Sequence, residues 1–253
     1  MKPWRAILLS VGLLLTGTPA HGQKEPSPPA GAAARARAIL ADALKAAGGR
    51  ERLDQIRTLA ITGETIITSP LGPVRSQRRI LLVLPDRLRV EVNLPGLTLI
   101  QGFDGKTGWI SGPMGVQELP PAAFKEVRST LKRLTFVFYR TCEGEGVTLS
   151  YKGTTEWEGK SVDVVHYADA EDTFTLFFDS ASHRLVRLAY QGRDPFSGAS
   201  IEAEDLYFDY REVSGVVYPF RTVTRHAGKT FSEFRVSELA LNHSVDDAVF
   251  KKP

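Results

Sequence analysis

Residues 200–225, SIEAEDLYFDYREVSGVVYPFRTVTR, decide the fold class of this chain. Apolar and polar side chains recur with a two-residue period along 200–210 and again along 216–225, and Ser214-Gly215 lies between the two runs. Successive side chains of a strand point to opposite faces, so this period predicts strands rather than helices. Two such runs on either side of a glycine-containing turn indicate antiparallel neighbours.

The same period covers most of the chain on both sides of this segment. Gly, Pro, Asp or Asn bound each run, as at Asp104-Gly105. Runs this short and this regularly spaced predict about ten to thirteen antiparallel strands, and the lack of strand–helix alternation disfavours a parallel sheet. The expected strands span residues 59–68, 74–84, 87–94, 97–103, 108–111, 116–119, 147–152, 162–168, 173–179, 185–190, 200–210, 216–225 and 230–241.

Two stretches follow a helical period instead. Residues 32–47 are rich in alanine and end at a pair of glycines, and a short turn of helix is expected over 51–56. A longer helix is expected to begin at Pro120 or Pro121 and to end before Glu143. The apolar side chains of this helix fall on one face, at Phe124, Val127, Leu131, Leu134 and Phe138.

These elements predict an α+β fold in a single domain over residues 32–253. A sheet of this many twisted strands tends to curl, and a curled sheet with an apolar concave face leaves a hollow that helices can cover. We therefore expect a strongly curved antiparallel sheet that forms a half-open β-barrel, covered by two or three helices.

The first 22 residues have the layout of a cleavable signal peptide. Lys2 and Arg5 precede an apolar stretch of about ten residues, and small residues precede a cleavage point between Gly22 and Gln23. The apolar stretch is shorter than the roughly 20 residues that span a bilayer. We expect this segment to be removed on export, residues 23–31 to form a disordered tether, and the mature protein to be soluble in the periplasm.

The composition argues against several classes of protein. The 32 basic and 29 acidic residues give a net charge of +3, without the concentrated basic stripe of a nucleic-acid binder. Arg75, Arg78 and Arg79 lie in an alternating run and are interpreted as a solvated strand face. Cys142 is the single cysteine, so an internal disulfide is excluded.

No motif with catalytic or metal-binding spacing is found in the sequence. The histidines are scattered singly, and H-E-x-x-H, C-x-x-C and G-x-S-x-G are all missing. Acidic residues do cluster, but Glu202 and Glu204 share one side of an expected strand and are interpreted as a solvated outer face. We therefore expect a non-enzymatic protein with no catalytic residues, no metal site and no cofactor.

Several motifs carry a resemblance to a known family. They are AAGGRERLDQI (46–56), PDRLRVE (85–91), FDGKTGW (103–109), FDS and LVR (178–180 and 185–187), DYREVSGVVYPF (209–220) and DDAVFKKP (246–253). In these stretches the chain resembles the bacterial outer-membrane lipoprotein-sorting superfamily, which has a LolA/LolB-like fold, and within it an uncharacterised periplasmic branch. The resemblance extends over essentially the whole mature chain.

The resemblance implies a half-open, strongly curved sheet that helices close around an apolar cavity. In the characterised carriers of that superfamily, the cavity accepts the acyl chains of lipoproteins. No ligand-binding or catalytic residue of those carriers is matched by a motif in this chain, so the resemblance assigns none.

We expect a periplasmic carrier or binder of a lipid, a lipoprotein acyl chain or another long apolar ligand, held on the concave face of the sheet. Burial of each methylene contributes about 0.8 kcal/mol, so an apolar cavity can hold a lipid without a polar anchor. The sequence leaves open which strand face points inward. The candidate lining residues are Leu97, Leu99, Trp109, Phe174, Leu176, Phe178, Phe208 and Phe220.

Two alternatives remain open at this point. In the first, side chains fill the core and the protein is a non-enzymatic interaction module that binds another protein of the cell envelope. A cavity smaller than an acyl chain would favour this alternative. In the second, the protein is an envelope hydrolase, which a buried pair of carboxylates or a serine within reach of a histidine would indicate.

Overall fold

Each run with a two-residue period forms a strand in the computed structural model, which describes residues 31–194 and 198–253. The predicted signal peptide and nearly all of the predicted tether lie outside the described residues. Within the described ranges, thirteen strands form one antiparallel sheet. The strands are β1 Thr58–Ser69, β2 Gly72–Val83, β3 Arg87–Leu94, β4 Leu97–Phe103, β5 Gly108–Gly112, β6 Gly115–Glu118, β7 Thr148–Trp157, β8 Lys160–Ala168, β9 Thr173–Asp179, β10 Leu185–Arg193, β11 Ser200–Val213, β12 Val216–His226 and β13 Lys229–Leu241.

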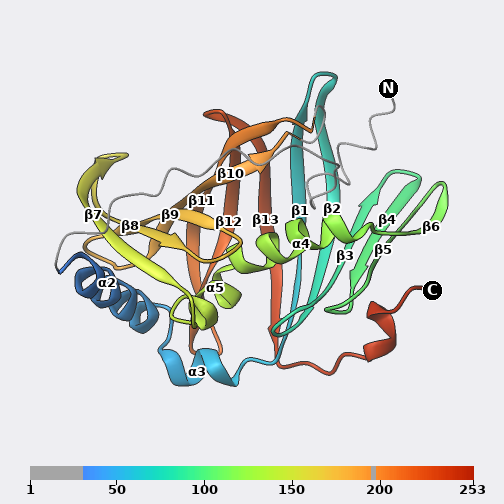
Figure 1. Cartoon of the computed structure of the whole chain (residues 1–253). Helices are drawn as coiled ribbons and strands as arrows, with labels where there is room; N and C mark the ends of the chain where they lie inside the picture. The colour runs from blue at the N-terminus through green and yellow to red at the C-terminus, as the bar shows by residue number, and fades with distance from the viewer. Residues whose placement is uncertain (1–30, 195–197) are drawn as a thin grey trace.

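Two meanders make up the sheet, and a long-range pairing joins them. The strand order is β6-β5-β4-β3-β2-β1-β13-β12-β11-β10-β9-β8-β7. β1 and β13 meet at the junction of the meanders, where Leu59 lies opposite Leu241 and Ile67 lies opposite Ser232. Figure 1 shows these two strands side by side between the two meanders.

The chain has to cross the whole sheet between β6 and β7, because these consecutive strands form opposite edges. The crossing consists of two helices, α4 (Pro121–Arg133) and α5 (Thr135–Thr141), which run across one face of the strands (Figure 1). We call them the crossover helices. One continuous helix was the expectation, which was wrong: Leu134 is extended, with φ −65° and ψ 126°. The break lets Leu131 and Phe138 enter one core from two separate helices.

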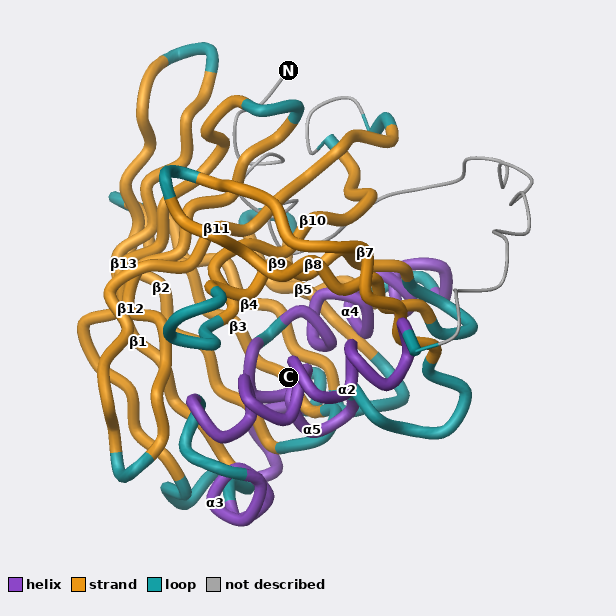
Figure 2. The backbone as a smooth tube through the Cα atoms, turned by 90° about the vertical axis from the view of Figure 1, so that its left-hand side faces the viewer, coloured by secondary structure: helices purple, strands orange, loops and turns teal. Residues whose placement is uncertain are grey.

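Two further helices precede the sheet in the chain. α2 (Ala32–Ala46) packs along β7 and buries the apolar face that its helical period predicts. The Ala47 carbonyl accepts a hydrogen bond from the Val217 amide at 3.0 Å, which ties the end of α2 to β12. α3 (Arg50–Gln55) contacts α5. Figure 2 shows these helices gathered on one side of the strands.

The hydrophobic core lies between the helices and the face of the sheet that they cover. Tyr167 stacks on Phe174 with ring centroids 5.4 Å apart, and Phe138 of α5 meets the edge of Tyr167 at 5.9 Å. Burial of a large apolar side chain contributes about 1.5–3 kcal/mol, so this cluster fixes α5 to β8 and β9. The structure confirms the predicted α+β fold, with a curved and unclosed antiparallel sheet covered by helices.

A β-bulge shapes the sheet at the junction of its two halves. The register of β1 against β13 shifts between Thr62 and Gly63. A Cβ atom on Gly63 would lie 2.2 Å from the Arg235 carbonyl oxygen and 2.8 Å from the Phe234 ring. Only glycine therefore lets the two strands approach this closely, and the bulge adds local twist to the sheet.

Gly63→Ala is expected to destabilise the protein by about 1–3 kcal/mol, because the added methyl group overpacks a backbone contact that cannot move aside. Urea unfolding followed by circular dichroism measures the change. Gly112→Ala is the matched control. Its Cβ would lie 3.1 Å from the flexible end of the Leu99 side chain, and no backbone atom is among its contacts within 4 Å. Equal stability of the two variants would contradict the prediction.

Candidate ligand cavity beneath the crossover helices

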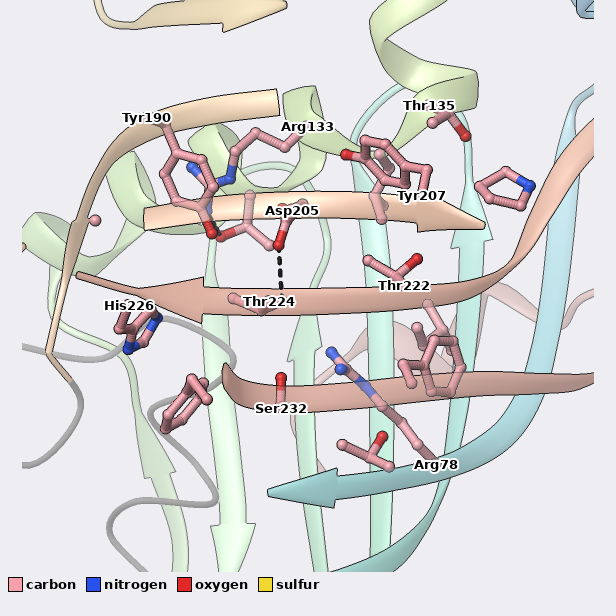
Figure 3. A pocket seen from close by; sticks show the side chains of 18 of the residues that line it. Arg78, Arg133, Thr135, Tyr190, Asp205, Tyr207, Thr222, Thr224, His226 and Ser232 are labelled. Carbon is pink, nitrogen blue, oxygen red and sulfur yellow. Dashed lines mark hydrogen bonds between the residues drawn. The ribbon is translucent and has the colours of Figure 1, made fainter. Parts of the chain in front are cut away.

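A cavity of about 190 Å³ lies between the crossover helices and the sheet (Figure 3). Side chains of six strands and of both crossover helices contribute to its wall. Among them are Thr65 of β1, Arg78 of β2, Tyr190 of β10, Asp205 and Tyr207 of β11, Thr222 and Thr224 of β12, Ser232 and Phe234 of β13, Arg133 of α4 and Thr135 of α5. The wall therefore combines aromatic rings with hydroxyl and charged groups.

Arg78 brings a positive charge into this cavity. Ser76 and Ile80, which share its side of β2, are both buried, so the Arg78 side chain points inward. Its guanidinium lies 5.7 Å from the centre of the Phe234 ring. The Nε atom of Arg78 has no hydrogen-bond partner among the described residues. Burial lowers the pKa of Arg78 to about 10, so the group keeps its charge at neutral pH.

Asp205 faces the same cavity from β11. Its Oδ1 atom accepts a hydrogen bond of 2.7 Å from the Thr224 hydroxyl. Burial raises the pKa of Asp205, and this effect outweighs the opposing effects of Thr224 and Arg133. No ion pair joins Asp205 to Arg78 in the part of the chain that the structure describes. The two groups therefore face one hollow without direct contact.

Three tyrosines give the wall its amphipathic character. Burial raises the pKa of Tyr190, Tyr207 and Tyr218, that of Tyr218 to about 12, so all three phenols are neutral at physiological pH. Tyr218 stacks on Phe136 of α5 with ring centroids 4.9 Å apart. A tyrosine presents an apolar ring and a polar hydroxyl, so this wall suits a ligand that has both characters.

Arg133 of α4 closes one side of the cavity. Its guanidinium lies 4.0 Å from the centre of the Tyr190 ring, a cation–π distance. It also donates hydrogen bonds to the Ser129 hydroxyl at 2.7 Å and the Thr130 hydroxyl at 3.0 Å, and it lies 3.8 Å from Glu126. We call the contact between Arg133 and Tyr190 the latch, because it links α4 to β10.

A larger depression of about 990 Å³ adjoins the cavity at the latch. Glu126, Tyr190, Gly192 and Arg193 line both spaces. The remaining wall of the depression is largely polar and includes Lys125. Displacement of the latch would therefore join a small amphipathic hollow to a wider and more polar one.

The structure places the sequence-predicted lining residues mostly in the packed core. Leu99, Leu176, Phe178 and Phe220 are buried there, and Phe174 is buried while it also borders the adjoining depression. None of the eight predicted residues lines the 190 Å³ cavity in the described structure. Their contact with a ligand stays a prediction.

The other three predicted residues lie outside that group. Leu97 packs against the core while partly exposed. Phe208 points to the opposite face of β11 from Tyr207, where Arg221 lies 4.8 Å from its ring. Trp109 packs on Gly102 and donates a hydrogen bond of 2.8 Å to the Phe250 carbonyl. It therefore holds the C-terminal 3₁₀ turn Asp247–Phe250 against β4.

The sequence interpretation missed Arg78 as a cavity residue. Arg75 and Arg79 are exposed, as expected for a solvated face, but Arg78 points inward. The two-residue period contained the signal, because Arg78 has the same parity as the apolar Ile80 and Leu82. An arginine on the apolar side of a strand is unusual enough to mark a site.

The described residues also bear on catalysis and on membrane insertion. No group of three His, Cys, Asp or Glu side chains placed to hold a metal occurs among them. His226 stacks on Phe231 at 4.2 Å beside the cavity, and its Nδ1 atom has no hydrogen-bond partner in the described ranges. Burial lowers the pKa of His226, so its imidazole is neutral at pH 7. No described helix is long and apolar enough to cross a bilayer.

Comparison with known proteins identifies the fold. No family model and no curated protein sequence matches the chain. A domain from Vibrio parahaemolyticus described as an outer membrane lipoprotein-sorting protein matches with TM-score 0.55 and 13% identity, over 83% of this chain and 97% of that one. A LolA superfamily protein from Nitrosomonas europaea matches with TM-score 0.59 and 13% identity, over 86% and 97%. A DUF1329 family protein from Desulfovibrio piger matches with TM-score 0.58 and 9% identity, over 85% and 97%.

The chain has a LolA-like fold. This agrees with the resemblance seen in the sequence motifs, and identities of this size establish the architecture alone. The residues that line the cavity of this LolA-like protein therefore have to be interpreted from their own geometry.

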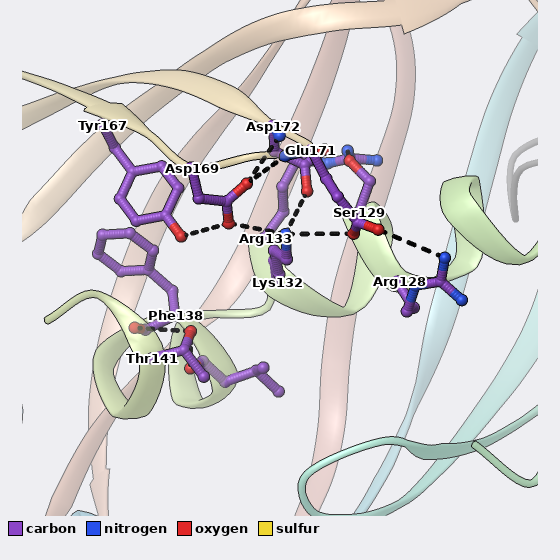
Figure 4. A network of polar contacts seen from close by, with 11 residues as sticks. Arg128, Ser129, Lys132, Arg133, Phe138, Thr141, Tyr167, Asp169, Glu171 and Asp172 are labelled. Atoms are coloured by element: carbon purple, nitrogen blue, oxygen red, sulfur yellow. Dashed lines mark hydrogen bonds and ion pairs between the residues drawn. The ribbon is translucent and has the colours of Figure 1, made fainter. Parts of the chain in front are cut away.

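In this LolA-like fold a polar network joins α4 to the turn between β8 and β9 (Figure 4). Lys132 of α4 donates hydrogen bonds of 2.7 Å to Asp169 and to Asp172 in the turn between β8 and β9. The Tyr167 hydroxyl and the backbone amides of Glu171 and Asp172 also donate to Asp169, each at 2.8 Å. Burial alone would raise the pKa of Asp169, but the hydrogen bonds, above all that of Lys132, hold this pKa down at about 2.

Asp169→Asn is expected to lower stability by about 2 kcal/mol at pH 7, because the amide keeps the turn geometry but loses the ion pair. The pKa of Asp169 is depressed in the folded state, so its contribution is present above about pH 4 and is lost as the pH falls toward 2. The difference in unfolding free energy between wild type and Asp169→Asn should therefore shrink as the pH falls from about 4 toward 2. Urea unfolding at several pH values measures it.

Asp42→Asn on the exposed side of α2 is the matched control for this carboxylate. The role given to Asp169 would be contradicted if Asp169→Asn lost the same unfolding free energy at pH 7 and at about pH 2.5. It would also be contradicted if Asp42→Asn lost as much as Asp169→Asn.

Proposed function

We propose that this protein is exported to the periplasm and there binds and carries a lipid, a lipoprotein acyl chain or another long amphipathic molecule beneath its crossover helices. The observation that supports this most directly is the hollow between α4, α5 and the curved sheet. Tyrosine and phenylalanine rings line part of it, and the sheet is not closed. Each methylene of a ligand that enters such a hollow contributes about 0.8 kcal/mol to binding.

The dimensions of the hollow indicate how a long ligand would be accommodated. A volume of about 190 Å³ lies below the roughly 300–1,000 Å³ of pockets that enclose drug-sized ligands. The ligand therefore has to displace the latch, so that the cavity and the adjoining depression become one space. The latch is a contact between one arginine and one aromatic ring, whose contribution of roughly 0.5–2 kcal/mol is small enough for a ligand to replace.

Two further features support the proposal. The protein from Vibrio parahaemolyticus with the same fold is described as a lipoprotein-sorting protein. The first 22 residues of this chain have the layout of a signal peptide, which would deliver the protein to the compartment where such sorting takes place. Neither feature calls for catalysis.

The small volume of the cavity, about 190 Å³, supports a second candidate function. A non-enzymatic interaction module of the cell envelope would need no hollow, and its partner would contact the outer surface. The two candidates differ in whether a lipid co-purifies with the protein. Native mass spectrometry of protein isolated from periplasm decides between them: bound lipid supports the carrier, and a ligand-free protein that also fails to bind fluorescent fatty acids supports the module.

Thr222→Phe is expected to reduce fatty-acid binding at least tenfold, because the added ring fills much of the cavity from its β12 wall. Titration with a fluorescent fatty acid measures the affinity. Thr68→Phe makes the same substitution at an exposed position of β1 and should leave the affinity unchanged. Equal binding by both variants would show that the ligand does not enter the cavity.

A further inference from the structure

We propose that Arg78 binds an anionic head group, a carboxylate or a phosphate, of the molecule that occupies the cavity. This inference rests on the proposed function and makes it more specific, because it names the ligand as an anionic amphiphile rather than any long apolar compound.

Among the described residues, no side chain satisfies the charge of Arg78. Among the described residues no carboxylate forms an ion pair with it, and its Nε atom has no hydrogen-bond partner. Half-buried arginines elsewhere in the sheet do have such partners: Arg89 pairs with Glu91 at 2.8 Å and Arg221 with Glu233 at 3.1 Å. A desolvated charge without a partner is strongly unfavourable. Arg78 thus has the environment of a group whose partner arrives from outside the chain.

Several hydroxyl groups line the cavity together with Arg78. The Thr65 side chain is 4% exposed, lines the cavity and leaves its Oγ1 atom without a hydrogen-bond partner in the described structure. Ser232 and Thr222 line the same space, and Figure 3 shows the guanidinium end of Arg78 directed toward Ser232. A planar guanidinium fork together with hydroxyl donors matches the oxygens of a carboxylate or phosphate.

The other charged groups of the described wall have partners within the chain. Asp205 accepts a hydrogen bond from Thr224, Glu126 lies 3.8 Å from Arg133, Arg193 donates a hydrogen bond of 3.1 Å to the Gly198 carbonyl, and Asp194 interacts with His226. Of the three arginines in that wall, Arg78 is the one without a hydrogen-bond or ion-pair partner. Gly63 lies opposite Arg78 and has no side chain to block the approach. The head group would lie on the β1–β2–β13 floor, and the chain would extend past the latch.

The test compares ligands that differ only in their head group. A bound fluorescent fatty acid is displaced from the full mature chain by dodecanoate, dodecyl phosphate or dodecanol, which share one chain length. Wild-type protein should prefer the two anions over the alcohol by about tenfold or more. Arg78→Met should lose this preference while it still binds dodecanol, and Arg78→Lys should keep part of it. Arg79→Met, its exposed neighbour on the same strand, should behave as wild type.

The other outcomes contradict either the head-group assignment or the carrier function. If wild type binds dodecanol as tightly as dodecanoate, or if Arg78→Met keeps the preference, the head-group assignment is overturned and the carrier function stands. If no C12 compound binds, the carrier function fails as well. Inorganic phosphate against sodium chloride at equal ionic strength distinguishes the source of the anion: stabilisation of wild type but not of Arg78→Met by phosphate alone would overturn the amphiphile in favour of a free anion.

Discussion

The antiparallel pairing of β1 with β13 is the interaction on which the rest of the structure depends. It joins segments that are far apart in the chain, Leu59 with Leu241, and it thereby makes β6 and β7 the outer edges of the sheet. The chain between those edges has to travel the width of the sheet. A crossing segment satisfies its own backbone hydrogen bonds only when it is regular, so helices are the stable solution. For this reason the crossover helices cover the hollow.

The most apolar part of the covered face is the part that the protein fills itself. Phe138 of α5 packs against Tyr167, which stacks on Phe174, and all three side chains are buried. The hollow persists where Arg78 and Asp205 face inward, because charged groups cannot be covered by apolar side chains without a large loss of solvation. Close packing thus moves the open space toward the polar side of the core. The wall of the cavity therefore presents polar groups as well as aromatic rings.

The contrast between the packed apolar core and the polar hollow explains which features could be predicted from the sequence. The two-residue period is a local signal, and it predicts all thirteen strands and the curled α+β sheet. The β1–β13 pairing and the break at Leu134 depend on contacts distant in the chain, so no local pattern reveals them. Apolar side chains such as Phe178 and Leu176 were chosen as lining because they are apolar, yet that property is what packs them into the core. Arg78, by contrast, was readable from its strand parity.

The break at Leu134 gives the two crossover helices different roles. α5 buries four consecutive large side chains, from Phe136 to Tyr139, so its removal would expose much apolar surface. α4 buries Val127 and Leu131 in the same core, and Lys132 and Arg133 at its C-terminal end add polar contacts to the β8–β9 turn and to β10. α5 therefore contributes mainly apolar contact, whereas α4 combines apolar contact with the polar contacts that join the crossover helices to the strands.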